Sequence, residues 1–119
     1  PIVTFTPHLV PMNRGILSTA YCKLKIPMSL PDLRILYRNF YNGERFVRVQ
    51  DDIIPNPRYI KGSNYCDIGI YLDPRSGSVI TVAALDNLVK GAAGQAIQAM
   101  NLMLGFPEET GLTAPAAYP

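Results

Sequence analysis

The sequence is poor in the residues from which metal sites and disulfide frameworks are built, and it lacks long apolar runs. Its 119 residues include no tryptophan, one histidine and two cysteines. The cysteines, Cys22 and Cys66, belong to no CxxC pair, and one histidine cannot complete a zinc site with them. Apolar runs are only a few residues long, whereas a membrane-spanning helix needs about 20 apolar residues. We therefore expect no metal site and no membrane span. A single disulfide between the two cysteines remains one of the possibilities.

Charge of either sign is also scarce. Charged residues make up 17% of the chain and hydrophobic residues 48%, a balance that excludes an intrinsically disordered tail and a coiled coil. Eleven basic residues against nine acidic ones give a net charge of +2, and the basic residues are scattered. We therefore expect no nucleic-acid-binding surface. The length predicts one globular domain over residues 1–119.

The two ends of the sequence differ in character. The chain begins with Pro1 and the β-rich run Ile2-Val3-Thr4-Phe5, without an initiator methionine or a signal-peptide pattern, and it finishes in small and polar residues. This contrast predicts the C-terminal piece of a longer protein. The absence of a secretory signal favours a cytoplasmic location.

Alternating and helical patterns predict an α+β domain. Ser29 and Pro31 are typical of a helix start, residues 73–77 have hairpin turn chemistry, and Asp86 is placed to cap a last helix that Gly105 ends. The expected elements are a strand over 16–25, a helix over 29–41, a strand over 46–49, a loop over 51–62, strands over 65–72 and 78–85, and a helix over 86–104. We expect a largely antiparallel β-sheet with helices packed on one face.

The first candidate site is the segment Thr6-Pro7-His8-Leu9-Val10-Pro11-Met12-Asn13-Arg14-Gly15. Prolines on both sides of His8 stiffen it as an extended loop, a suitable mount for a group that transfers protons near neutral pH. Arg14 is suited to clamp a carboxylate or phosphate. The alternative is a surface histidine in a proline-rich turn with a solvated arginine.

The second candidate site lies at the start of the last helix, Asn87-Leu88-Val89-Lys90-Gly91-Ala92-Ala93-Gly94-Gln95. Gly91 and Gly94 each cost a helix about 1 kcal/mol relative to alanine, so either a ligand or another backbone must approach closely there. Lys90 and the free N–H groups of the helix start suit an anionic or amide-bearing ligand. The alternative is a small-residue helix packed tightly on the sheet. The segment is not a GxGxxG dinucleotide motif.

A third segment, Gly62-Ser63-Asn64-Tyr65-Cys66-Asp67-Ile68-Gly69, leads into a predicted strand. Cys66 and His8 together suggest a nucleophile and its base. Because Cys66 begins an alternating strand, packing in the core is the favoured interpretation.

Read together, the three segments resemble the N-acetyl-gamma-glutamyl-phosphate reductases, a branch of the semialdehyde dehydrogenase family, over nearly the whole chain. The resemblance implies the C-terminal substrate-binding and dimerisation domain of an NADPH-dependent enzyme of arginine biosynthesis. In that reaction a cysteine thiolate attacks N-acetyl-γ-glutamyl phosphate, phosphate leaves, and hydride transfer to the thioester gives N-acetylglutamate 5-semialdehyde.

The resemblance also implies roles for particular residues. His8 matches the family's catalytic histidine, Arg14 is the expected substrate contact, and the expected cofactor contacts are Asn87, Lys90, Gly91 and Gly94. Neither Cys22 nor Cys66 lies in the family's nucleophile segment, and the N-terminal dinucleotide-binding unit is absent. We therefore expect this chain alone to be inactive and to bind no NADP(H).

The expected partners are the missing N-terminal domain, the acyl-phosphate substrate and a second copy of the chain. A sheet with helices on one face leaves the other face to be covered, which predicts a homo-oligomer. The set proposed for that apolar face is Ile68, Ile70, Leu72, Val79, Thr81 and Ala83. The alternative function is a non-catalytic oligomerisation module of the same fold.

Overall fold

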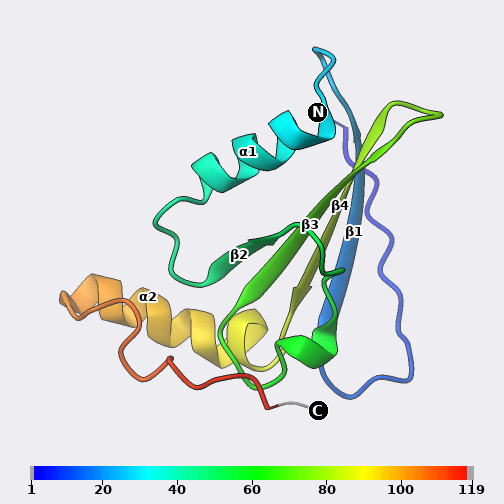
Figure 1. Cartoon of the computed structure of the whole chain (residues 1–119). Helices are drawn as coiled ribbons and strands as arrows, with labels where there is room; N and C mark the ends of the chain where they lie inside the picture. The colour runs from blue at the N-terminus through cyan, green and yellow to red at the C-terminus, as the bar shows by residue number, and fades with distance from the viewer. Residues whose placement is uncertain (1, 118–119) are drawn as a thin grey trace.

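The computed structural model describes residues 2–117. Its elements are β1 (Ile16–Lys23), α1 (Leu30–Phe40), β2 (Val47–Gln50), the 3-10 helix η1 (Pro57–Tyr59), β3 (Cys66–Asp73), β4 (Ser78–Leu85), the π-helical turn η2 (Val89–Ala93) and α2 (Gly94–Leu104). The four strands form one sheet in the order β1-β4-β3-β2 (Figure 1).

The sheet is mixed, with antiparallel pairs dominating. β3 and β4 pair antiparallel from Cys66 opposite Leu85 to Asp73 opposite Ser78, and β1 pairs antiparallel with β4. β2 pairs parallel with β3, because the loop that carries η1 is long enough to return the chain in the same direction. The predicted α+β domain with a largely antiparallel sheet is confirmed, with this one parallel pair as the difference.

Helix α1 forms where its capping residue and apolar spacing predict it. Ser29 caps it by accepting a hydrogen bond from the Asp32 amide, and Pro31 occupies the first turn. The buried side chain of Leu33 packs into the core against Ile68, Ile70 and Val79. Burying a leucine side chain contributes roughly 1.5–3 kcal/mol, so this contact is a principal attachment of α1 to the sheet.

Both helices lie on the same side of the sheet (Figure 1). α1 covers β2 and β3, and the start of the last helical segment meets the opposite end, where Gly91 lies close to the side chains of Leu85 and Ile16. The register places Leu85 and Ile16 on the face that also carries Cys66 and Ile68.

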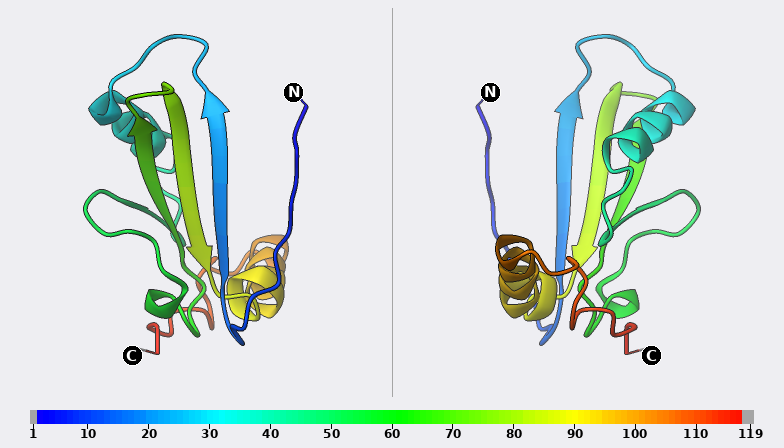
Figure 2. Two further views of the ribbon diagram at one scale, coloured as in Figure 1. Left: turned by 90° about the vertical axis from the view of Figure 1, so that its right-hand side faces the viewer. Right: turned by 90° about the vertical axis from the view of Figure 1, so that its left-hand side faces the viewer.

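The predicted interface set is therefore wrong. Ile68, Ile70 and Val79 are buried in the core, with Leu72 and Ala83 packed against them, because α1 covers this face. Thr81, paired with Ile70, lies on the same face. The other face of β1 and β4 carries no helix (Figure 2, left). It presents Leu17 and Tyr21, the latter 72% exposed and paired with Ile80. A sheet with apolar residues on both faces does not reveal from alternation alone which face a helix covers.

No helix within residues 2–117 combines the length and the apolar character that a bilayer crossing requires.

Candidate functional site

A buried carboxylate joins three distant parts of the chain where β4 ends. Asp86 is 0% exposed. Its Oδ2 accepts hydrogen bonds from Arg14 Nη2 at 2.7 Å and from the Gly62 amide at 2.6 Å. Its Oδ1 accepts from the amides of Leu88 at 2.8 Å and Val89 at 3.0 Å. We call this arrangement the Asp86 joint; it fixes the start of β1, the turn before β3 and the first turn of the last helical segment together.

The Asp86 joint holds its carboxylate in the charged form. Burial by itself raises the pKa of Asp86, but the hydrogen bonds from Gly62, Arg14, Leu88 and Val89 together outweigh it and lower the pKa to about 2. The carboxylate is therefore ionised at neutral pH, and the salt bridge to Arg14 balances its charge.

A second contact reinforces the joint through Gly15. The Gly15 amide donates to Asn87 Oδ1 at 2.6 Å. Gly15 has a φ of 102°, and a Cβ there would clash with the Cβ of Pro57. Glycine is thus required at this position both by conformation and by the close approach of η1.

The structure does not bring His8 and Arg14 to the same space. The N-terminal segment that carries His8 runs extended beside the edge of β1, and Figure 2 shows it separate from the sheet. His8 is exposed, and within residues 2–117 its ring makes one hydrogen bond, between Nδ1 and the Thr6 carbonyl oxygen at 3.2 Å. Arg14 meanwhile directs its guanidinium to Asp86. The catalytic role of His8 and the substrate contact of Arg14 stay predictions.

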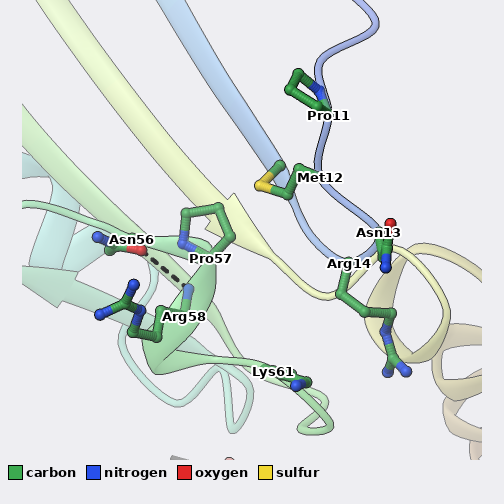
Figure 3. Close-up of a pocket in the computed structure, with 8 residues that line it drawn as sticks. All are labelled: Pro11, Met12, Asn13, Arg14, Asn56, Pro57, Arg58 and Lys61. Carbon is green, nitrogen blue, oxygen red and sulfur yellow. Dashed lines mark hydrogen bonds between the residues drawn. The ribbon is translucent and has the colours of Figure 1, made fainter. Parts of the chain in front are cut away.

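Arg14 does line a pocket of about 430 Å³ (Figure 3). Residues 11–14 form one wall of the pocket, and residues 56–58 with Lys61 form the other. His8 is not among the residues that line it.

The helix start that was expected to offer free N–H groups is already occupied. The amides of Leu88 and Val89 donate to the Asp86 carboxylate, and the Gly91 amide donates to the Asp86 carbonyl oxygen at 2.8 Å. The chain itself thus supplies the anion that the first turn favours. Asp86 accepts from these amides as the expected cap would, but the helix expected over 86–104 begins later. The π-helical turn starts at Val89, with Leu88 as its N-cap residue, and α2 starts at Gly94.

Gly94 is explained by packing. It is buried, and a Cβ there would clash with Oδ1 of Asn64 and lie 2.7 Å from the Val89 carbonyl oxygen. Gly91 is exposed, and its Cβ would lie 3.3 Å from the Asp86 carbonyl oxygen. Of the two interpretations offered for these glycines, close packing accounts for Gly94, and contact with the cofactor stays a prediction.

This difference predicts unequal effects of alanine at the two positions. We expect Gly94→Ala to lower the free energy of unfolding by about 1–3 kcal/mol, because a buried methyl group would force Asn64 or the helix backbone to move. Gly91→Ala is the matched control and is expected to change stability by less than about 1 kcal/mol, since helix propensity there offsets a mild contact. Urea unfolding of both variants measures this, and equal losses would contradict the packing explanation.

Lys90 is held in a network that sequence patterns did not indicate. Its Nζ donates to Gln98 Oε1 at 2.7 Å and lies 5.6 Å from the centre of the Phe46 ring. Gln98 Oε1 also accepts from Asn64 Nδ2 at 3.0 Å, and Gln98 Nε2 donates to Glu108. Only the i, i+8 spacing of Lys90 and Gln98 could have suggested a shared helix face.

Cys66 packs as a structural residue. Burial raises the pKa of its thiol, the negative charge of Asp67 raises it further, and Lys90 opposes these effects in part. Cys66 is therefore a neutral thiol near pH 7 and packs against the core, in agreement with the favoured interpretation. Cys22 is exposed, and both cysteines are free thiols, so Cys22 and Cys66 do not form a disulfide.

A second ion pair, also not indicated by sequence, lies on the opposite face of the sheet. Arg48 donates to Asp67 through Nε at 2.6 Å and Nη2 at 3.0 Å, and its guanidinium lies 4.5 Å from the centre of the Tyr65 ring. Asp67 is buried, so this bidentate pair is a fixed connection between β2 and β3.

Comparison with known proteins identifies the class. Residues 1–87 match the family model described as "Semialdehyde dehydrogenase, dimerisation domain". The chain belongs to this family. The match includes β1 to β4 and ends immediately before the last helical segment.

Within the class, the chain is similar in sequence to enzymes of one name. It is 56% identical to the N-acetyl-gamma-glutamyl-phosphate reductase of Geobacter metallireducens and 52% identical to that of Pelotomaculum thermopropionicum, over 98% of this chain and 34% of each relative. The chain therefore spans about a third of the length of these relatives.

A solved structure supports the fold. Aspartate semialdehyde dehydrogenase II from Vibrio cholerae superposes with a TM-score of 0.65 at 18% identity, covering 81% of this chain and 29% of that one.

Proposed function

We propose that the chain is the C-terminal part of an N-acetyl-gamma-glutamyl-phosphate reductase, which converts N-acetyl-γ-glutamyl phosphate to N-acetylglutamate 5-semialdehyde and phosphate. The observation that carries the proposal is the identity of 52–56% to reductases of that name over 98% of the chain. Because the chain covers 34% of those relatives, the activity belongs to the larger enzyme, for which a cytoplasmic location stays expected.

In the proposed reaction His8 is the acid and base beside a thiol that lies outside this chain. The thiolate attacks the acyl carbon and phosphate departs with the bonding electrons. NADPH, when bound, supplies the hydride that reduces the resulting thioester. The thiohemiacetal then collapses to the aldehyde and regenerates the thiol, and His8 holds and returns the proton in these steps. The exposed position of His8 leaves its ring accessible to a group from another part of the enzyme.

The proposed cofactor contacts differ in how well they fit that role. Gly91 is exposed and Lys90 is partly exposed, so both retain surface that a cofactor can reach. Gly94 is buried, and Asn87 already uses its Oδ1 for the Gly15 amide. Lys90 also already uses its Nζ, for Gln98 Oε1, so Gly91 is the better candidate for a contact with NADPH.

The rest of the reductase is the proposed partner of α2. This helix lies beyond the residues matched by the dimerisation-domain model, and apolar side chains remain exposed along it. Met103 is 84% exposed, and Met100, Leu104 and Phe106 are also exposed. Such a patch is typical of an interface, and we assign it to the preceding domain of the enzyme. The second copy of the chain is assigned to the open face of the sheet around Tyr21 and Ile80, in line with the description of the family.

An activity assay separates this proposal from a non-catalytic oligomerisation module. The 119-residue chain alone is expected to show no NADPH-dependent reduction of acyl phosphate, because it contains neither the nucleophile segment nor a dinucleotide-binding unit. The complete polypeptide, with the region that precedes this chain in its relatives, is expected to be active. Absorbance at 340 nm monitors both reactions. Turnover by the isolated chain, or a complete polypeptide that assembles but does not turn over, would contradict the proposal.

A further inference from the structure

The pocket beside Arg14 carries basic side chains that the chain itself leaves without a partner. None of the residues that line it is acidic. Among residues 2–117, the side chains of Arg58 and Lys61 make no hydrogen bond and no ion pair. Figure 3 shows Arg14 extending away from Arg58, toward the last helical segment. Arg58 and Lys61 are thus the lining cations that remain free to bind a ligand.

Both walls of the pocket are fixed by the same buried joint. Arg14 and the Gly62 amide share Oδ2 of Asp86, so the chain on either side of the pocket is fixed to one carboxylate. Gly15 and Pro57 are in close contact across the base of the two walls. Asn56 caps η1 by accepting from the Arg58 amide at 2.9 Å. The walls therefore hold their shape without a ligand, which lowers the entropic cost of binding one.

The charge of the pocket is not balanced from within. Asp86, the acid that pairs with Arg14, is buried and is not among the residues that line the pocket. The lining therefore carries two basic side chains without a partner in the described part of the chain, Arg58 and Lys61, and no acidic side chain to balance their charge.

We infer that this pocket binds an oxyanion, with Arg58 and Lys61 as its direct contacts. A guanidinium and an ammonium on fixed walls suit a phosphoryl or a carboxylate group, because both present anionic oxygens to N–H donors. The inference rests on the proposed function only for the source of the anion, since an N-acetylglutamyl phosphate carries both a phosphoryl group and a carboxylate. Lys61 and Arg58 are thereby assigned to substrate binding, beside the predicted contact at Arg14.

Titration of the 119-residue chain with inorganic phosphate tests the pocket without any turnover. Saturable binding is expected by calorimetry at low ionic strength. The double variant Arg58→Gln/Lys61→Gln is expected to bind at least about tenfold more weakly, because two charge-assisted contacts are lost. The matched control is Arg45→Gln/Lys25→Gln, which removes one exposed arginine and one exposed lysine outside the pocket. This control is expected to bind as the unmodified chain does.

The outcomes are distinct. Absence of saturable binding, or equal weakening in the control, overturns the inference. Titration with N-acetylglutamate shows which oxyanion the pocket accepts. If N-acetylglutamate competes with phosphate, the pocket binds carboxylates as well as phosphoryl groups. If only phosphate binds, the pocket is specific for the phosphoryl group. If the pocket binds phosphate while the complete polypeptide fails to reduce acyl phosphate, the proposed function is wrong but the inferred oxyanion site is retained.

Discussion

Replacing Asp86 by asparagine is expected to lower the free energy of unfolding by about 3–5 kcal/mol, the cost of breaking a buried ion pair. Asp86 accepts hydrogen bonds on both oxygens, from four donors in three parts of the chain. An asparagine offers one acceptor oxygen, and its NH₂ group would face two of those donors. The shape of the side chain is kept, but two N–H groups lose their acceptor and Arg14 loses its counter-ion.

Urea unfolding of Asp86→Asn and Asp86→Ala at pH 7 measures the effect. Asp52→Asn is the control, because Asp52 is exposed and is not part of the Asp86 joint, and it is expected to change stability by less than about 0.5 kcal/mol. A loss of under about 1 kcal/mol for Asp86→Asn would contradict the role assigned to the joint.

The same carboxylate predicts the acid sensitivity of the fold. Its pKa of about 2 in the folded chain lies below the value near 3.9 expected for an unfolded aspartate. The stabilisation from Asp86 is therefore complete above about pH 4 and is lost as the pH falls toward 2, by roughly 2 kcal/mol in total. The Asp86→Asn variant should lack this part of the pH dependence.

Replacing His8 by asparagine in the complete reductase is expected to lower kcat by about 10²–10⁴, the usual effect of losing a positioned acid or base. The fold should be unaffected, because His8 is exposed and its one hydrogen bond within residues 2–117 is to Thr6 of the same segment. We expect a change in stability of less than about 0.5 kcal/mol.

Steady-state kinetics with a full pH profile distinguishes this role from that of a turn histidine. The pH profile of kcat in the variant should differ in shape from that of the unmodified enzyme, because an acid and base that acts in turnover contributes to that profile. Thr4→Ala, in the same exposed segment, is the control and should retain normal turnover and the normal profile. Near-normal kcat in His8→Asn would remove His8 from the chemistry.

Local chemistry determined which elements could be predicted from sequence. Ser29, the turn at residues 73–77 and Asp86 were identified correctly, because caps and hairpin turns depend on neighbouring residues. The resemblance in three segments also identified the family. The direction of β2 was not predicted, since it depends on how the loop carrying η1 crosses the sheet.

The architecture of the candidate site was predicted only in part. Arg14 and Asp86 were both singled out, but their contact spans 72 positions and no local pattern indicates it. The same is true of Asn64 and Gln98, whose side chains contact each other across 34 positions. Asn64 also explains Gly94, because a Cβ on that glycine would clash with Asn64 Oδ1. Arg58 and Lys61 are ordinary basic residues in sequence, and only the fold places them in one pocket with Arg14.

Strand β1 has a further consequence for the chain on its own. It is an outermost strand of the sheet, all eight of its residues are exposed, and it is hydrogen-bonded on one side by β4. Its other side presents a row of backbone amide and carbonyl groups, which is a template for adding another strand. Nothing along it before Lys23 carries a charge that would discourage such pairing. The isolated chain is therefore prone to self-association edge to edge, and a segment of the larger enzyme that occupied this edge would prevent aggregation as well as extend the sheet.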